Sequence, residues 1–140
     1  MSPRRLEERR LWKAVLNVII STGGDPQRIR EHFDRLREMA RNLMREMEEK
    51  ARRGEQVTMQ EAGLFAVASP YYYIGVARKM LKELDKAEQL ATSILTTLQQ
   101  TRRLEKTWLL WKARKLGLVR LLRKAHQIAT RNAIQLSLIK

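Results

Sequence analysis

The stretch that decides the fold is PYYYIGVARKMLKELDKAEQLATSILTTL, residues 70–98. Its apolar residues recur at alternating spacings of four and three positions. They are Tyr73, Ala77, Met80, Leu84, Ala87, Ala91, Ile94 and Leu98. Such spacing keeps one narrow apolar stripe on one side of an α-helix, whereas a strand would need a period of two. Because Pro70 suits the first turn of a helix, the sequence predicts one long helix that packs along a single stripe.

A second long helix with the same kind of stripe is predicted over 25–53. Asp25-Pro26 supplies a helix start and Gly54 a stop signal. The stripe comprises Ile29, Phe33, Leu36, Ala40, Leu43 and Met47. Residues 25–57 contain nine basic and eight acidic side chains, which nearly cancel. We therefore expect a bundle helix with a solvated outer face rather than a helix that reads DNA bases.

Two shorter helices are predicted in the first half of the chain. Ser2-Pro3 forms a cap and first-turn pair, and Gly23-Gly24 ends the segment, so a helix is expected over about 3–21. The front half of that helix is basic and its back half is apolar nearly all round, which predicts burial against a neighbour. Thr58 and Glu61 have the spacing of a capping box ahead of an apolar run, which predicts a short helix before residue 70.

The last forty-two residues, 99–140, concentrate the positive charge. They contain eleven Lys or Arg and a single acid, Glu105, and so carry +10 of the formal net charge of +14. Their apolar residues form a new stripe, made of Leu104, Trp108, Trp111, Leu118, Val119, Leu122, Ala125 and Ala129. Basic residues gather on the opposite side at helical phase: Arg102, Lys106, Lys112, Arg120, Arg123, Lys124 and Arg131. The segment is predicted to be a basic amphipathic helix or a pair of helices.

Two positions decide whether that C-terminal helix is continuous. Residues 99–103 include no apolar side chain, so they form either a solvated part of one very long helix or a hinge with Thr101 as the next cap. Gly117 weakens a helix by about 1 kcal/mol relative to alanine and is a candidate for a second bend.

Together these patterns predict an all-α fold, a helical bundle with extended basic N-terminal and C-terminal helical arms. We divide the chain into a basic N-terminal helical arm (1–24), a helical bundle core (25–98) and basic amphipathic C-terminal helices (99–140). The apolar run at 14–20 is too short for a membrane span, and no signal-peptide cleavage pattern follows it. The chain is therefore expected to be soluble.

Few residues have the chemistry of an active site. The chain contains no cysteine, and its two histidines, His32 and His126, lie in no metal-binding motif. A satisfied or solvated role is favoured for both histidines over a role as ligand or base. Neither a phosphate-binding glycine loop nor a nucleophile elbow is present. We expect no catalysis, no metal and no cofactor.

Two groups of aromatic residues each have two interpretations. Residues 71–73 are three consecutive tyrosines that cannot share one helix face, so at least one is exposed or contacts a partner. Packing between subunits is favoured for them over stacking on unpaired bases. Trp108 and Trp111 stand one turn apart among basic residues, where stacking on bases is again an option. Their place in the apolar stripe favours burial in the core or in an interface.

The charge asymmetry favours a polyanionic partner over a solvated basic surface, because unneutralised like charges destabilise a compact state. Duplex nucleic acid has the highest linear charge of the polyanions, and a subunit of +14 would match the phosphates of about 7 base pairs. No recognition-helix pattern stands out, so we expect sequence-independent contacts with phosphates. The candidate DNA-binding residues are Arg4, Arg5, Arg9, Arg10, Lys13, Arg102, Arg103, Lys106, Lys112, Arg120, Arg123, Lys124 and Arg131.

A short, cysteine-free, Arg-rich helical chain with a basic N-terminal helix and basic C-terminal helices interleaved with Trp108 and Trp111 resembles one family. It is similar to the major coat proteins of filamentous viruses of hyperthermophilic archaea. The resemblance covers the overall pattern of the chain and assigns no individual residue. It implies a virion protein whose helical arms and bundle wrap double-stranded DNA, held in A-form, in a helical nucleocapsid. The partners implied are that DNA and either copies of this chain or a related coat chain.

Three other functions stay open on the sequence alone. One is a regulatory or architectural DNA-binding dimer, which would saturate at one dimer per defined site. Another is a structural helical bundle whose charge serves solubility and which would not bind DNA in a salt-dependent way. The third is a basic amphipathic protein of the membrane surface, which would prefer anionic vesicles to DNA.

Overall fold

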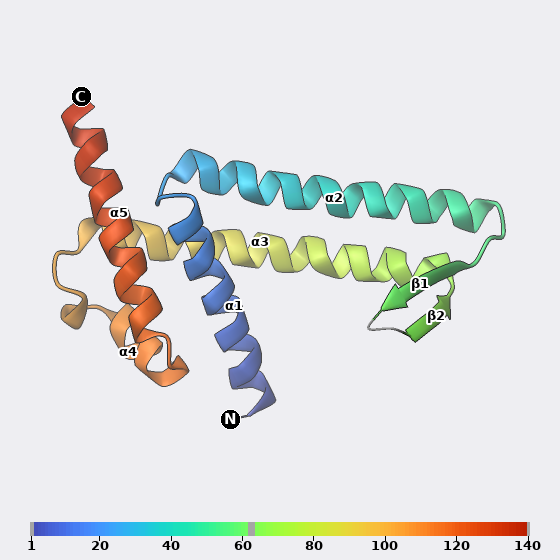
Figure 1. The fold of residues 1–140 in the computed structure, drawn as a ribbon, viewed down its shortest axis with the longest axis horizontal. Helices are drawn as coiled ribbons and strands as arrows, with labels where there is room; N and C mark the ends of the chain where they lie inside the picture. Colours follow the sequence, from blue (N-terminus) through green and yellow to red (C-terminus); the bar gives the residue numbers. More distant parts are fainter. Residues whose placement is uncertain (1, 62–63, 140) are drawn as a thin grey trace. The chain divides into compact units, whose positions relative to one another are not determined.

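The computed structural model describes residues 2–61 and 64–139, and most of this part is helical (Figure 1). Its helices are α1 (Pro3–Ser21), α2 (Pro26–Arg52), α3 (Pro70–Gln100), α4 (Trp108–Leu116) and α5 (Val119–Ile139). One turn of 3-10 helix, η1 (Leu104–Lys106), precedes α4, and two short strands, β1 (Val57–Glu61) and β2 (Leu64–Ala68), join α2 to α3. The predicted helical character of the chain is confirmed.

The chain divides into two compact units. Residues 1–32 and 86–140 form one, which we call the terminal unit, and residues 33–85 form the other, the hairpin unit. The first part of α2 and the last part of α3 belong to the terminal unit, and the rest of each helix belongs to the hairpin unit. Neither division falls at residues 24 or 98, the boundaries predicted from the sequence.

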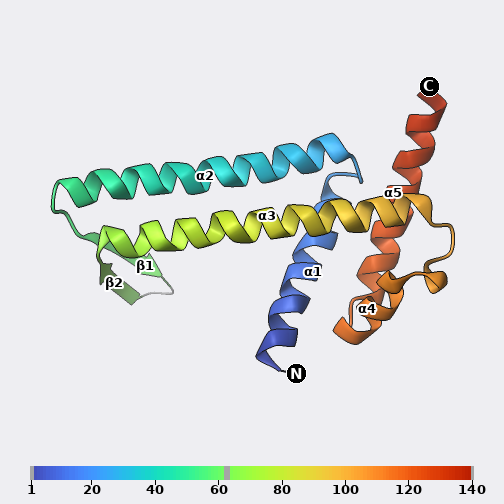
Figure 2. The same cartoon turned by 180° about the vertical axis from the view of Figure 1, so that it is seen from behind.

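In the terminal unit, α1 packs alongside α5 and also contacts α4 (Figure 2). The buried side chains of α1 are Trp12, Val15, Leu16 and Ile19, and those that α4 and α5 contribute include Leu109, Leu110, Ala113, Leu116, Leu122, Ala125 and Ala129. The N-terminal and C-terminal helical segments expected as arms therefore pack against each other in this unit. The apolar back half of α1 finds its neighbour in the C-terminal helices, so both ends of the chain share one core.

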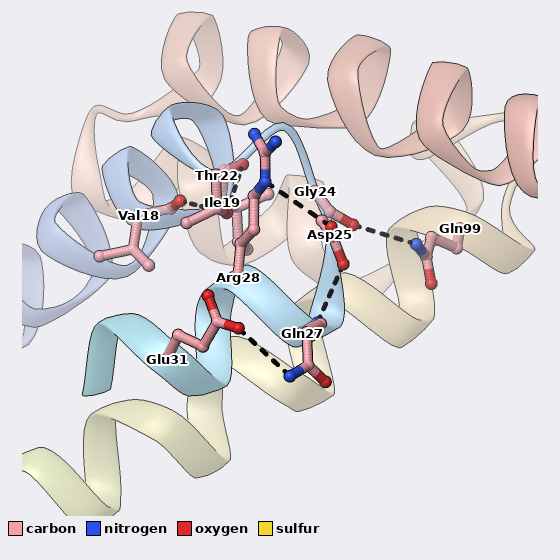
Figure 3. Close-up of polar contacts among 9 residues, drawn as sticks. All are labelled: Val18, Ile19, Thr22, Gly24, Asp25, Gln27, Arg28, Glu31 and Gln99. Atoms are coloured by element: carbon pink, nitrogen blue, oxygen red, sulfur yellow. Dashed lines mark hydrogen bonds and ion pairs between the residues drawn. The ribbon is translucent and has the colours of Figure 1, made fainter. Parts of the chain in front are cut away.

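Hydrogen bonds hold the turn between α1 and α2 in place (Figure 3). The Thr22 hydroxyl donates a hydrogen bond to the Val18 carbonyl at 2.7 Å, and the Gln99 side-chain amide donates to the Gly24 carbonyl at 3.4 Å. Gly24 has a φ of 69°, and a Cβ placed there would lie 3.0 Å from the Cα of Ala129 in α5. Glycine is favoured at this position, because a side chain would be strained both by the left-handed backbone and by the close approach to Ala129.

The C-terminal region bends at residues 99–103, where the sequence left two alternatives open, and at Gly117, the candidate for a second bend. Helix α3 ends at Gln100, so residues 99–103 include a hinge rather than continuing one long helix. The next helix begins after Thr107, so Thr101 is not its cap. Instead, the Thr101 carbonyl accepts a hydrogen bond from His126 Nε2 at 2.6 Å, which confirms a satisfied role for that histidine. Gly117, with φ 69°, ends α4 in the left-handed conformation.

The hairpin unit is built on the two predicted stripes. Met47, Val57 and Ile74 form its buried cluster, with Leu43 and Tyr73 packed against it. Met80, predicted to lie in the stripe of α3, is instead exposed. Between α2 and α3, Arg37 Nε forms an ion pair with Asp85 Oδ1 at 3.0 Å.

The predicted short helix that starts at Thr58 is wrong. Residues 57–61 and 64–68 pair as antiparallel strands, with Val57 opposite Ala68 and Glu61 opposite Leu64, while positions 62 and 63 lie outside the described residues. A helix of about a dozen residues is marginal by itself, and β-branched residues at 57, 58 and 67 favour strands. The capping-box spacing does not outweigh the pairing that a hairpin provides.

Candidate nucleic-acid interface

The positive charge of the chain belongs almost entirely to the terminal unit. That unit contains nineteen basic and six acidic residues, a net +13, whereas the hairpin unit contains ten and nine, a net +1. A charge of this size within one folded unit produces a strong positive potential around it. The structure therefore concentrates the charge more than the sequence segments do, because it adds α1 to the basic C-terminal helices.

Helix α5 presents the longest cationic face of this unit. Leu122, Ala125 and Ala129 are buried on one side, and Arg120, Lys124 and Arg131 are exposed on the opposite side. These three cations extend over about 16 Å of helix at 1.5 Å per residue. Within the described part of the chain, none of them is paired with a carboxylate. The face is thus free to meet an external anion.

Helix α1 contributes four of the predicted cations in exposed positions, namely Arg4, Arg5, Arg10 and Lys13. The hydroxyl of Ser2 caps this helix by accepting a hydrogen bond from the Arg5 backbone N–H at 3.2 Å. Because α1 packs against α4 and α5, its cations belong to the same folded unit as the α5 face. The structure thereby brings the two ends of the predicted site into one body.

Two predicted DNA-binding residues are engaged inside the unit instead. Arg9 Nε donates a hydrogen bond to the Leu116 carbonyl at 3.0 Å, at the C-terminal end of α4, where a cation is favourable. Lys112 of α4 forms an ion pair with Glu8 of α1. Both cations are half-buried, so we interpret them as links between α1 and α4 rather than as free phosphate contacts.

The cations between α3 and α4 are exposed. Arg102, Arg103 and Lys106 all lie in this connection, next to Glu105. A hydrogen bond from the backbone N–H of Glu105 to its own carboxylate lowers the pKa of that group, and nearby Arg123 lowers it further. Arg123 Nη1 lies 3.7 Å from the Glu105 carboxylate, so one cation of α5 is partly neutralised.

Four residues of this surface were not predicted from the sequence to be exposed site residues. Trp108 and Trp111, expected to be buried, are both exposed, and so are Arg114 and Lys115, which were not among the predicted site residues. The buried side of α4 is made of Leu109, Leu110, Ala113 and Leu116. The i, i+4, i+7 spacing of positions 109, 113 and 116 was the signal that places both tryptophans on the outer side.

No family model, curated protein or solved structure matches this chain. Its site is therefore interpreted from geometry and charge. Within residues 2–61 and 64–139, every helix is too short or too polar to serve as a membrane span. The same residues include no cluster of His, Asp and Glu side chains placed to hold a metal ion.

Proposed function

We propose that this chain is a structural coat or nucleoprotein subunit that binds double-stranded DNA along its phosphates and assembles into a helical nucleocapsid. The observation that carries the proposal is the net charge of +13 on one folded unit, with the acid-free face of α5 at its surface. The resemblance to the coat proteins of filamentous archaeal viruses agrees with this function and suggests a place in the virion.

The α5 face suits a regular array of phosphates. Duplex DNA carries one negative charge per about 1.7 Å of axis, so about 16 Å of helix lies beside roughly ten charges. Arg120, Lys124 and Arg131 would contact some of these phosphates directly, and exposed cations of α1 would add further contacts. Because Lys and Arg contacts with phosphates carry no sequence information, this binding would be sequence-independent.

The hairpin unit suits contacts between subunits. Its net charge of +1 lets two copies approach without strong repulsion. Tyr71 and Tyr72 are exposed at the start of α3, and tyrosine is enriched in protein interfaces. A subunit of this kind would bind DNA through one unit and neighbouring subunits through the other.

Electron microscopy of the purified protein with random-sequence duplex DNA tests the proposal. We expect regular filaments that cover the DNA end to end, and an affinity that falls steeply as salt is raised from about 50 to 200 mM. Discrete particles at defined sites would favour a regulatory dimer. Binding that is absent, or insensitive to salt, would contradict the proposal.

A further inference from the structure

Two tryptophans stand at the surface of the basic unit. Trp108 is 48% exposed and Trp111 is 59% exposed, at the first turn of α4. They are three residues apart, so their side chains are neighbours on one side of the helix. Exposed tryptophan is unusual, because this side chain gains more than any other from removal from water. A pair of them suggests a surface that a ligand covers.

Each ring has a neighbour within the terminal unit. Trp108 packs edge-on against the buried Trp12 of α1, with ring centroids 5.7 Å apart and planes at 89°. The Lys115 ammonium lies 3.9 Å from the centroid of Trp111, a cation–π contact one turn further along α4. Beneath them, Leu109 and Leu110 are buried and anchor the helix. Rings fixed in this way lose little conformational freedom when a ligand binds.

The charge around the pair selects the kind of ligand. Helix α4 contains no acid, and of its three cations Lys112 is paired with Glu8 of α1, whereas Arg114 and Lys115 are exposed. Two copies of the same face would bring like charges together, so this surface is unsuited to a symmetric contact between subunits. The ligand that fits must combine flat apolar groups with negative charge. Nucleobases on a phosphate backbone have both.

We propose that Trp108 and Trp111 form a stacking site for unpaired nucleobases, with Arg114 and Lys115 beside it for the adjoining phosphates. The inference rests on the proposed nucleic-acid function and adds single strands to its ligands. In an intact duplex, both faces of an internal base are already stacked, so the site engages bases at ends, unpaired stretches or single strands. Stacking on aromatic side chains accepts any base, which agrees with sequence-independent binding.

The test compares two oligonucleotides of equal length and charge, one of thymidines and one of abasic nucleotides, each about 12 nucleotides long to suit typical single-strand sites. Fluorescence anisotropy of end-labelled oligonucleotides gives the affinities. We expect the unchanged protein to bind the thymidine oligomer about tenfold more tightly than the abasic one. In the double variant Trp108→Ala/Trp111→Ala, the two affinities become equal.

Matched controls separate stacking from other effects. The variant Tyr71→Ala/Tyr72→Ala removes two exposed aromatic side chains from the near-neutral unit, and the preference for bases should persist in it. The single variant Trp111→Ala alters only the more exposed ring and should lose part of the preference. Far-ultraviolet circular dichroism checks that each variant keeps its helices.

Several results would overturn the stacking site. Equal affinity of the unchanged protein for both oligonucleotides is one, and a preference that survives in the double variant is another. Tighter binding to anionic phosphatidylserine vesicles, lost in the double variant, would assign the pair to a membrane surface instead. If the preference for bases is absent while salt-dependent duplex binding remains, the stacking site fails and the proposed function stands. If neither duplex nor abasic oligomer binds, the proposed function fails.

Discussion

The two units of this chain both contain long helices, but their charged side chains are arranged differently. In the hairpin unit, several cations are paired with acids close to them in the sequence, as in the pairs Arg37–Asp34 at 3.0 Å and Arg53–Glu49 at 2.5 Å. In the terminal unit, Arg120, Lys124 and Arg131 align on one side of α5 without such partners among the described residues. Matched charge gives a solvated structural surface, whereas aligned charge needs an external anion.

The interiors of the two units also differ, in how completely their apolar side chains are buried. Among the side chains that the structure describes, the largest fully buried ones belong to the terminal unit: Val15, Leu16, Ile19, Ile94, Leu98, Leu109, Leu110, Leu116 and Leu122. In the hairpin unit, the cluster around Met47 and Ile74 keeps a few percent of its surface exposed. A net charge of +13 repels itself, so the unit that carries it requires a well-packed core. Core packing and charged surface are therefore linked in the terminal unit.

The largest effect is expected from breaking the core that joins the two ends of the chain. Leu16 is 0% exposed, and Leu16→Ala should lower the free energy of unfolding by about 3 kcal/mol, through lost burial and the cavity left behind. Urea denaturation followed by circular dichroism measures this. Leu6→Ala on the same helix, at 42% exposed, should cost less than about 1 kcal/mol. Equal, small effects would mean that α1 is a loose arm after all.

The next largest effect, on duplex binding, is expected from removing the three aligned cations of α5. The triple variant Arg120→Gln/Lys124→Gln/Arg131→Gln should weaken duplex binding by about 100-fold at low salt and reduce the slope of log affinity against log salt by about 3. Filter binding over a salt series measures both quantities.

The matched control makes the same change in the hairpin unit. Arg78→Gln/Lys79→Gln/Lys82→Gln also removes three exposed cations of one helix, α3, but should change duplex affinity only slightly. If both triple variants weaken binding equally, net charge alone governs the interaction, and the contrast between the two units has no functional meaning.

A smaller effect tests the close approach at the α1–α2 turn. Gly24→Ala adds a Cβ 3.0 Å from the Ala129 backbone in a left-handed conformation, so we expect a loss of about 2 to 3 kcal/mol in unfolding free energy. Gly23→Ala has a similar φ of 67° but meets no atom within 4 Å, so only about 1 kcal/mol should be lost. Thermal denaturation of the pair separates backbone strain from the contact with α5. Equal losses would rule out that contact.

Much of this fold follows from local signals in the sequence. Proline, glycine and capping residues predict where α1 and α2 begin and end, because these signals act within one turn of the chain. The stripe of α2 is likewise confirmed, since Ile29, Phe33 and Met47 are buried. The candidate bend at Gly117 rests on the same local chemistry, whereas for residues 99–103 the sequence left a hinge and a continuous helix as alternatives.

The incorrect predictions concern features that depend on contacts between residues far apart in the sequence. The packing of α1 against α5 depends on a partner about a hundred residues away, which no local pattern reveals. Trp108 and Trp111 would lie on the buried side only if one apolar stripe continued through the bends that interrupt it. Each short helix has its own phase, so the buried side of α4 must be found from positions 109–116 alone. Most of the candidate DNA-binding cations are exposed, but Arg9, Lys112 and Arg123 have intramolecular partners.

The smallest effect is expected at Glu105, the single acid of residues 99–140, which partly neutralises a cation of α5. Glu105→Gln releases Arg123 from its carboxylate neighbour, so duplex affinity should rise by roughly threefold at low salt. Glu83→Gln, which releases Lys79 in the hairpin unit, should leave the affinity unchanged. An equal rise in both variants would show that the position of the released cation is unimportant.

The same substitution has a pH signature in stability. Since the folded state lowers the pKa of Glu105, through the hydrogen bond from its own backbone N–H and then through Arg123, the ionised carboxylate stabilises the fold. That contribution is fully present above the ordinary pKa of an unfolded-state glutamate and is lost as the pH falls through the lower folded-state pKa. Glu105→Gln should therefore be slightly less stable than the unchanged protein at pH 7 and equally stable in acid. A difference that grows on acidification would contradict the assigned direction, because the carboxylate would then have to stabilise the fold in its protonated form.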